Sequence, residues 1–289
     1  MCGIAGIISA SRLDERDVRR LIDPITHRGP DDEGVWVDSE VGVGLGHRRL
    51  AIIDLSPAGH QPMSSADGRY VITYNAEIYN HAELRAELEK QQGAVPPGGW
   101  RGHSDTETLL ECVSAWGLDA TLPRIVGMFA FALWDRQERQ LHLVRDRFGE
   151  KPLYYGWVGK DFLFASELKA IRAHPRFDGE IDRRALRLFA ARTYIPAPFS
   201  IYKRLFKLEP GCVLTITPEE AVNRVEPNQL SADASVPSMS PCHPYRLVAF
   251  RISPCHPVTL SPCHPPKSRR KTPLWLGRGR SGTSSMGCG

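Results

Sequence analysis

The chain has 289 residues, of which 42% are hydrophobic and 24% charged, and no apolar run reaches the roughly 18 residues that a membrane-spanning helix needs. The net charge of +4 is unevenly spread, because residues 230–289 hold eight Lys and Arg against one acid. These numbers favour a globular, cytoplasmic chain without membrane or nucleic-acid partners. The apolar start ends at Ile8 without a cleavage signal, and the seven cysteines form no disulfide framework.

The order of periodic segments predicts an α+β protein. In chain order it predicts a helix over 14–25, strands over 34–38 and 70–75, helices over 80–91 and 104–116, a hairpin of strands over 128–135 and 139–146, strands over 152–158 and 162–166, and helices over 166–174 and 182–193. Asn80 is the expected N-cap of the second helix, and Ser104 with Glu107 is the expected capping box of the third. Strands and helices do not alternate one for one, which favours sheets covered by helices.

The last part of the chain has a different composition. The sequence SPCHP begins at Ser240, Ser253 and Ser261, within a stretch rich in proline and serine. Residues 221–289 are therefore predicted to be a basic, low-complexity, disordered tail. Zinc binding is not expected there, because adjacent Cys-His pairs followed by proline do not match the ligand spacing of zinc fingers. Translated repetitive DNA, joined to a truncated gene, is the favoured interpretation.

Cys2 is the first residue with potential chemistry. Once Met1 is removed, a terminal cysteine carries its own base, since a free α-amine has a pKa of roughly 7.7–8.0 and can take the thiol proton. The alternative from the residues alone is that Cys2 is a small apolar residue opening a buried strand. Position two does not decide between these two roles.

Several motifs, taken together and in order, resemble the glutaminase domain of class II glutamine amidotransferases, and asparagine synthetases in particular. The resemblance covers about residues 2–211. It rests on CGIAGI at the N-terminus and on HRGPDDEG (27–34), GHRRLAIIDLSPAGHQPM (46–63), YNAEIYNHAEL (74–84), RDRFGEKPLYYG (145–156), FASELKAI (164–171) and YIPAPFSIYKRLFKLEPG (194–211).

The resemblance implies a fold, a domain organisation and a substrate. The fold is an N-terminal-nucleophile αββα sandwich of four layers with two antiparallel sheets, and the substrate is L-glutamine. The glutaminase domain is expected over residues 2–193, and a remnant of the linker toward a synthetase domain over 194–220. The Ser-Gly-Gly-x-Asp-Ser loop of that synthetase domain does not occur in the sequence, so we expect a truncated enzyme. ATP and Mg²⁺ are expected only for the missing half, and the glutaminase half needs no metal or other cofactor.

The resemblance also assigns roles to residues that hold glutamine. Arg49 grips its carboxylate, which a planar guanidinium can do with two hydrogen bonds. Glu77 and Asp105 bind its ammonium group, although an acid in the first turn of a helix is favoured by the helix dipole in any case. Backbone groups beside the substrate come from the next stretch, whose alternating side chains otherwise read as a strand: Leu50, Ala51, Ile52 and Ile53.

Cys2 attack makes the amide oxygen an anion, which needs fixed donors. The resemblance assigns these donors to the side-chain amide of Asn75 and to the backbone N–H of Ala76. The family has glycine at the second position. Alanine keeps the N–H, but its Cβ would be strained if the turn there required a positive φ.

The leading hypothesis is a glutamine-hydrolysing domain of the asparagine synthetase type that acts through a Cys2 thioester. A phosphoribosyl- or hexosamine-forming amidotransferase is less compatible with RDRFGEKPLYY followed by YIPAP. An alternative of another class is an inactive, truncated remnant that binds glutamine or a partner. A homodimer or a separate synthetase domain are the expected protein partners.

Overall fold

The computed structural model describes residues 1–91, 96, 98–223 and 247–249. The SPCHP repeats lie outside these residues, as does most of the segment predicted to be a tail. Two pieces of that segment are described: residues 221–223 end a helix, and Leu247–Ala249 form strand β12. None of the described helices has both the length and the apolar character that crossing a membrane requires.

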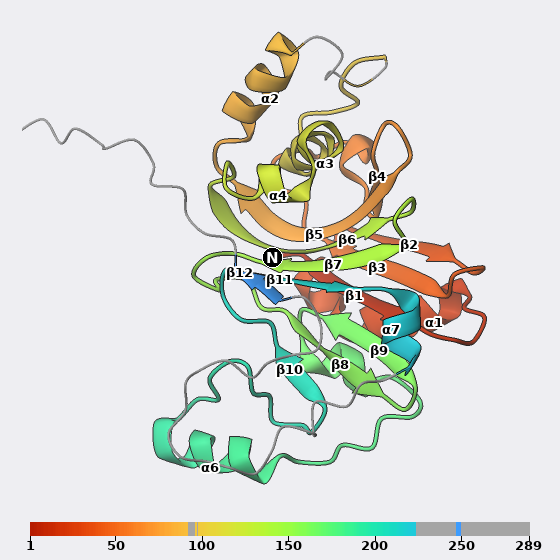
Figure 1. Ribbon diagram of the computed structural model, residues 1–289, viewed down its shortest axis with the longest axis vertical. Helices are drawn as coiled ribbons and strands as arrows, with labels where there is room; N and C mark the ends of the chain where they lie inside the picture. Colours follow the sequence, from red (N-terminus) through yellow and green to blue (C-terminus); the bar gives the residue numbers. More distant parts are fainter. Residues whose placement is uncertain (92–95, 97, 224–246, 250–289) are drawn as a thin grey trace, which may run out of the picture. The chain divides into compact units, whose positions relative to one another are not determined.

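Two antiparallel sheets form the centre of the protein (Figure 1). Within the described residues, the first sheet has the strand order β10-β8-β9-β1-β3-β2 and the second has the order β12-β11-β7-β6-β5-β4. The first is built from β1 (Gly3–Ile8), β2 (Asp32–Asp38), β3 (Val43–Arg49), β8 (Tyr154–Val158), β9 (Asp161–Ala165) and β10 (Leu205–Lys207). The second is built from β4 (Met63–Ser64), β5 (Tyr70–Ile78), β6 (Gly127–Asp135), β7 (Gln140–Arg145), β11 (Cys212–Ile216) and β12.

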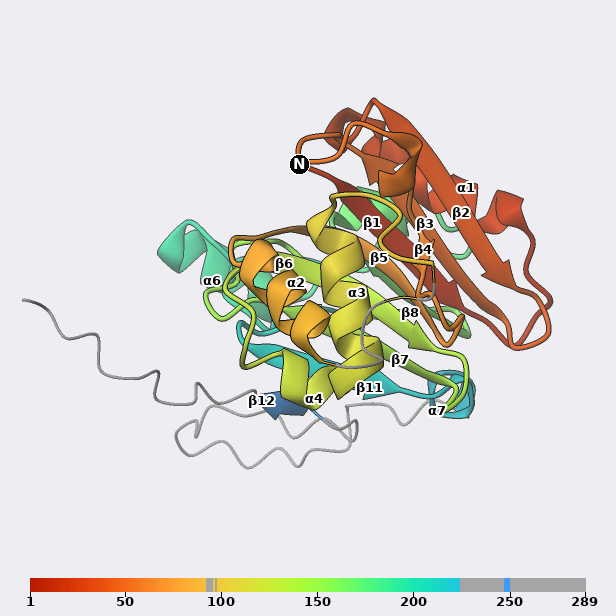
Figure 2. The same ribbon diagram turned by 90° about the horizontal axis from the view of Figure 1, so that it is seen from above.

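Helices cover the outer faces of both sheets. The helices α2 (His81–Lys90), α3 (Asp105–Trp116) and α4 (Leu118–Thr121) lie on the second sheet, where α2 and α3 run side by side in Figure 2. On the first sheet lie α1 (Glu15–Ile22), the 3₁₀ helix η1 (Asp23–Arg28) and α5 (Leu168–Arg172). The helices α6 (Arg183–Arg192) and α7 (Pro218–Asn223) come later in the chain.

Three buried apolar clusters separate these layers. The cluster between the sheets joins residues of β1 and β3 to residues of β6 and β7, for example Ile4, Leu45, Trp134 and Leu143. A second cluster lies between α3 and the second sheet, and a third between α1 and the first sheet. The order is therefore helix, sheet, sheet, helix, and the predicted α+β sandwich with four layers and two antiparallel sheets is confirmed.

Strand β3 is one of several strands that the sequence pattern did not predict. Its glycines at 44 and 46 remove the usual β-branched signal, but they serve the packing of α1. A Cβ built on Gly44 would lie 2.5 Å from Val18 Cγ2, and one on Gly46 would lie 2.6 Å from Ile22 Cγ2. The absence of both side chains lets α1 lie directly on the strand.

Several predicted boundaries and caps need correction. The helix predicted over 14–25 is α1 followed by η1, which has Pro24 in its first turn. Asn80 precedes α2 but its side chain makes no capping hydrogen bond; its Oδ1 accepts instead from the Val126 N–H at 2.9 Å. Ser104 does cap α3 by accepting from the Glu107 N–H at 3.2 Å. The carboxylate of Glu107 faces the preceding loop instead of returning to Ser104, since it accepts from the Arg101 and Gly102 N–H groups.

The segment 194–220, predicted to be a linker remnant, contributes a strand to each sheet. Strand β10 pairs with β8 and strand β11 pairs with β7. The predicted domain boundaries at residues 193 and 220 stay predictions.

Candidate active site

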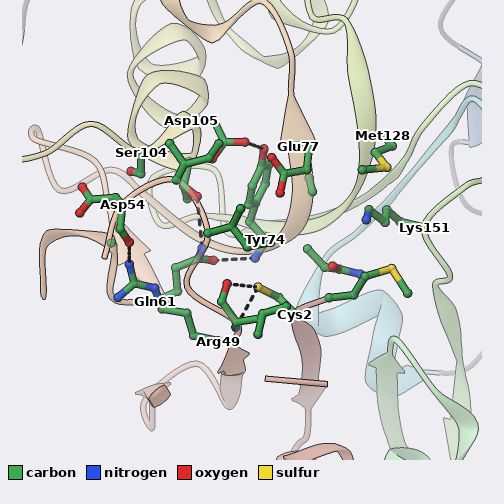
Figure 3. A pocket seen from close by; sticks show the side chains of 18 residues that line it. Cys2, Arg49, Asp54, Gln61, Tyr74, Glu77, Ser104, Asp105, Met128 and Lys151 are labelled. Atoms are coloured by element: carbon green, nitrogen blue, oxygen red, sulfur yellow. Dashed lines mark hydrogen bonds between the residues drawn. The ribbon is translucent and has the colours of Figure 1, made fainter. Parts of the chain in front are cut away.

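A pocket of about 160 Å³ opens where the N-terminus, the loop after β3, strand β5 and the start of α3 meet (Figure 3). Nine of the ten residues that the sequence assigns to glutamine hydrolysis line it, namely Cys2, Arg49, Leu50, Ile52, Ile53, Asn75, Ala76, Glu77 and Asp105. Ala51 is the exception, because it does not line the pocket and its N–H donates to Asp31 Oδ2 at 2.9 Å.

Cys2 lies directly before β1, at the floor of the pocket. Its Sγ is 3.4 Å from the Leu50 nitrogen, which donates to it, and its own carbonyl accepts from Arg28 Nε at 2.9 Å. Burial raises the pKa of the Cys2 thiol, while the Leu50 N–H, the N-terminal ammonium and Arg49 oppose that shift. A thiol whose pKa is raised needs a base nearby before it can act as a nucleophile.

The interior of strand β5 carries Asn75 and Ala76. Asn75 is 1% exposed, and its Nδ2 has no hydrogen-bond partner among the described residues. A buried amide donor without an acceptor costs about 1–3 kcal/mol, so its retention at the pocket wall points to an acceptor supplied by a ligand.

The backbone N–H of Ala76 faces the same edge of β5 as those of two neighbours. In a strand, alternate residues direct their N–H groups to the same edge. The Tyr74 N–H donates to Gln61 Oε1 at 2.8 Å and the Ile78 N–H donates to Asp105 Oδ2 at 2.9 Å. The Ala76 N–H lies between them, on the edge turned away from its partner Phe129 in β6. Ala76 does not have a positive φ, so the strain considered for alanine at this position is not present.

Asp105 and Glu77 supply negative charge at the opposite wall from Cys2 (Figure 3). Asp105 is the first residue of α3, and its Oδ2 also accepts from the Tyr74 hydroxyl at 2.5 Å. Burial raises the pKa of the Asp105 carboxyl, and these hydrogen bonds oppose the shift. Burial, followed by the nearby charge of Asp105, raises the pKa of Glu77. Both carboxyl groups line the pocket and both have raised pKa values, so together they are suited to binding a cationic ligand group.

Arg49 ends β3 and organises the loop that follows. Its Nη1 donates to the Ser56 carbonyl at 3.0 Å and its Nη2 donates to the Asp54 carbonyl. Gly59 is required here, because a Cβ on it would lie 2.0 Å from Arg49 Nη2. The strand suggested by the alternation over 50–53 is wrong: β3 ends at Arg49 and the next residues form a loop. Ile52 and Ile53 are 58% and 41% exposed at the rim of the pocket.

Asp54 anchors that loop to the start of α3. Its Oδ1 accepts from the Ser56 hydroxyl at 2.6 Å, and its Oδ2 accepts from the His103 N–H at 2.9 Å. These hydrogen bonds, the Ser56 hydroxyl first, lower the pKa of Asp54 to about 2. The loop is thereby held to Arg49 on one side and to the residues just before α3 on the other.

Other pocket residues were not singled out from the sequence. Gln61 links β5 to α3, because its Nε2 also donates to Thr106 Oγ1 at 3.2 Å. Lys151 is 4% exposed and lies near Glu77, whose negative form its charge favours; Met128 and Tyr74 complete the wall. Gln61, Tyr74 and Lys151 stand inside the motifs that carry the resemblance, which was the available signal, whereas Thr106 and Met128 stand outside them. No cluster of three or more His, Cys, Asp or Glu side chains that could hold a metal occurs among the described residues.

Comparison with known proteins decides the family. The family model described as a glutamine amidotransferase domain matches residues 1–225 of this chain. The chain belongs to the glutamine amidotransferase family. This confirms the resemblance seen in the sequence and extends it by 14 residues beyond Gly211.

Curated relatives narrow the family further. The amidotransferase chain is 39% identical over 232 residues to a putative glutamine-hydrolyzing asparagine synthetase 2 of Methanocaldococcus jannaschii, covering 72% of this chain and 42% of that protein. It is 38% identical over 224 residues to the glutamine-hydrolyzing asparagine synthetase 1 of Bacillus subtilis, covering 76% of this chain and 34% of that protein. The chain thus spans less than half the length of these relatives.

A solved structure supports the fold of this amidotransferase. The glutamine phosphoribosylpyrophosphate amidotransferase of Bacillus subtilis, complexed with ADP and GMP, matches 75% of this chain and 47% of its own with a TM-score of 0.55 at 20% identity. At that identity the likeness speaks for the fold alone. The expected sandwich of two antiparallel sheets between helices is therefore confirmed as a fold.

Proposed function

We propose that this amidotransferase hydrolyses L-glutamine to glutamate and ammonia through a thioester on Cys2. The observation that carries the proposal is that one pocket brings together the half-buried thiol of Cys2, the Asn75 Nδ2 donor without a partner, a guanidinium and two carboxylates. Attack on the side-chain amide of a zwitterionic amino acid would use all of these groups.

Glutamine binding would match charge to charge. Its carboxylate pairs with Arg49, and its ammonium group pairs with Asp105 and Glu77. Binding a cation between the two carboxylates favours their ionised forms, which opposes the upward pKa shift that burial causes. With both ends of the substrate held, the side-chain amide reaches the sulfur of Cys2 and the donors on β5.

The chemical step begins with a proton transfer. After removal of Met1, the free α-amine of Cys2 takes the thiol proton, and the sulfur attacks the amide carbon. The oxygen of the tetrahedral intermediate becomes an anion that accepts from Asn75 Nδ2 and from the Ala76 N–H. The C–N bond then breaks, and the α-ammonium returns its proton to the departing ammonia. Water, activated by the same amine, attacks the thioester and releases glutamate and the Cys2 thiol.

The relatives named as asparagine synthetases suggest where the ammonia goes. We propose that residues 1–225 act as the glutamine-hydrolysing part of such an enzyme, with a synthetase domain that makes asparagine from aspartate as the consumer of ammonia. ATP and Mg²⁺ belong to that synthetase reaction; the hydrolysis itself uses only groups of this chain and water. A cytoplasmic location and a homodimer stay predictions.

The test is release of glutamate and ammonia from L-glutamine by the purified chain. The wild-type protein, with Met1 shown by intact mass to be absent, should release both in equal amounts. Cys2→Ala should reduce release to background, whereas Cys112→Ala, at a buried cysteine outside the pocket, should not change the rate per folded molecule. Binding of glutamine without hydrolysis by the wild-type protein would support the alternative of an inactive remnant.

A further inference from the structure

A nucleophile at the start of a chain needs support, because terminal residues fray unless they are tied down. Cys2 precedes the first paired residue of the first sheet, Gly3, which lies opposite Arg48. One side chain holds the backbone of Cys2 directly: Arg28 Nε donates to the Cys2 carbonyl oxygen at 2.9 Å. Arg28 ends η1, and its side chain is 9% exposed.

Arg28 is itself fixed on two sides. Its Nη1 donates to Glu167 Oε1 at 2.9 Å. Its side chain also lies across Gly3, since a Cβ there would come within 3.4 Å of Arg28 Cβ and Cδ. The arginine side chain therefore packs against the residue that follows Cys2.

Glu167 is the centre of a small ionic cluster. It follows β9, and beside Arg28 it contacts His27 Nε2 at 3.0 Å and Lys169 Nζ at 3.1 Å. Burial raises the pKa of this carboxyl, but the hydrogen bonds from Arg28, Lys169 and His27 outweigh burial and lower the pKa to about 2. Glu167 is thus a carboxylate throughout the neutral range and a permanent acceptor for Arg28.

We propose that Arg28, oriented by Glu167, is a positioning residue for the Cys2 nucleophile. By fixing the Cys2 carbonyl it fixes the peptide plane next to Cα, and so the directions in which the sulfur and the α-amine leave that carbon. Arg28 does not line the pocket and so does not contact bound glutamine. It acts on the rate of attack and leaves substrate binding alone. The proposal rests on the proposed glutamine hydrolysis.

The test separates kcat from KM for glutamine in a double-mutant cycle. Arg28→Gln should lower kcat by about 10- to 100-fold, the loss expected when a reacting group is displaced by about 1 Å, with KM within about twofold of wild type. Arg28→Lys keeps the charge but cannot donate to both acceptors in the same geometry, and it should recover only part of the rate. Glu167→Ala should also lower kcat, and the double variant should be no slower than Arg28→Gln alone, because Glu167 acts through Arg28.

Arg48→Gln is the matched control. Arg48 is 11% exposed and, like Arg28, donates to a backbone carbonyl and a carboxylate, those of Ile22 and Asp23. Its removal should leave kcat unchanged. If Arg28→Gln does not fold, the kcat of Glu167→Ala, at a residue 26% exposed, decides the question.

The proposal is overturned by an Arg28→Gln or Glu167→Ala enzyme with wild-type kcat, by a change confined to KM, or by losses that multiply in the double variant. An inactive wild-type protein would instead overturn the proposed function, so the two failures are distinguishable.

Discussion

The two walls of the pocket are built differently. Asn75, Ala76 and Glu77 lie inside β5, which pairs with β6 over its whole length from Tyr70 to Ile78. Cys2 lies directly before β1 and Arg49 is the last residue of β3. Hydrogen bonds from the Arg28 side chain to Cys2, and from Arg49 to the following loop, hold them. In the proposed reaction, the second sheet provides the wall that would stabilise the developing charge. Cys2, the proposed nucleophile, lies next to a terminus from which Met1 has to be removed.

The largest effect should come from the wall that the second sheet provides. Asn75→Ala removes the unpartnered Nδ2 donor and should lower kcat by about 10²–10³-fold, as for other oxyanion donors, with little change in KM. Steady-state glutaminase kinetics measure this. Thr73→Ser, two residues earlier on the same face of β5 and equally buried, is the control and should keep the wild-type kcat. If Asn75→Ala changed KM more than kcat, Asn75 would be binding the substrate glutamine and not stabilising the anionic intermediate.

A smaller effect is expected where β5 meets α3. Asp105→Asn can keep both internal hydrogen bonds, because Tyr74 and Ile78 donate to the same carboxylate oxygen, yet it removes the negative charge. We expect kcat/KM for glutamine to fall by about 10- to 150-fold, the loss of one charge-assisted hydrogen bond of about 1.5–3 kcal/mol. Tyr74→Phe, which removes a hydrogen bond and keeps the charge, should have the weaker effect. The reverse ranking would mean that Asp105 is structural.

The contact between β3 and β5 through His47 should affect how the free energy of unfolding depends on pH. His47 on β3 is fully buried and contacts the Tyr74 carbonyl on β5 through Nε2 at 3.0 Å. Burial lowers its pKa from 6.5 to about 4. Between these values the unfolded chain binds more protons than the folded chain, so stability is complete above pH 6.5 and falls as the pH drops toward 4, by about 3 kcal/mol for this group. Urea unfolding measured at several pH values should show that the unfolding free energy of His47→Gln does not fall in this way between pH 6.5 and 4. The same dependence on pH in both proteins would contradict the lowered pKa of His47.

The sequence predicted the fold well where a strand or helix had an unbroken pattern. The strand expected over 128–135 is β6, Gly127–Asp135, and the helix expected over 182–193 is α6, Arg183–Arg192. The prediction failed where tertiary packing selected the residues. In β3, for example, the glycines are present because side chains there would clash with α1. The missing cap at Asn80 has the same cause, because the side chain is engaged by the loop at Val126.

The sequence predicted the site residues that have a single chemical role toward glutamine. Cys2, Arg49, Asn75, Glu77 and Asp105 converge on one pocket, as the roles that the resemblance assigns to them implied. Gln61 has no single chemical role of this kind. It lies just before β4 begins and accepts from the Tyr74 N–H in place of a strand neighbour, which only the register of β4 on β5 reveals. Arg28 acts through contacts separated by 26 and 139 residues in the chain, which no local pattern encodes.

The most direct test of the account is affinity labelling with a chloromethyl ketone analogue of glutamine, followed by peptide mapping. The analogue carries the carboxylate and ammonium groups that Arg49 and Asp105 are proposed to bind, and its electrophilic carbon stands where the amide carbon would be. Alkylation of the Cys2 sulfur is expected, at a rate that excess L-glutamine suppresses. Absence of label on Cys2, or labelling of Cys2 that glutamine does not slow, would contradict it.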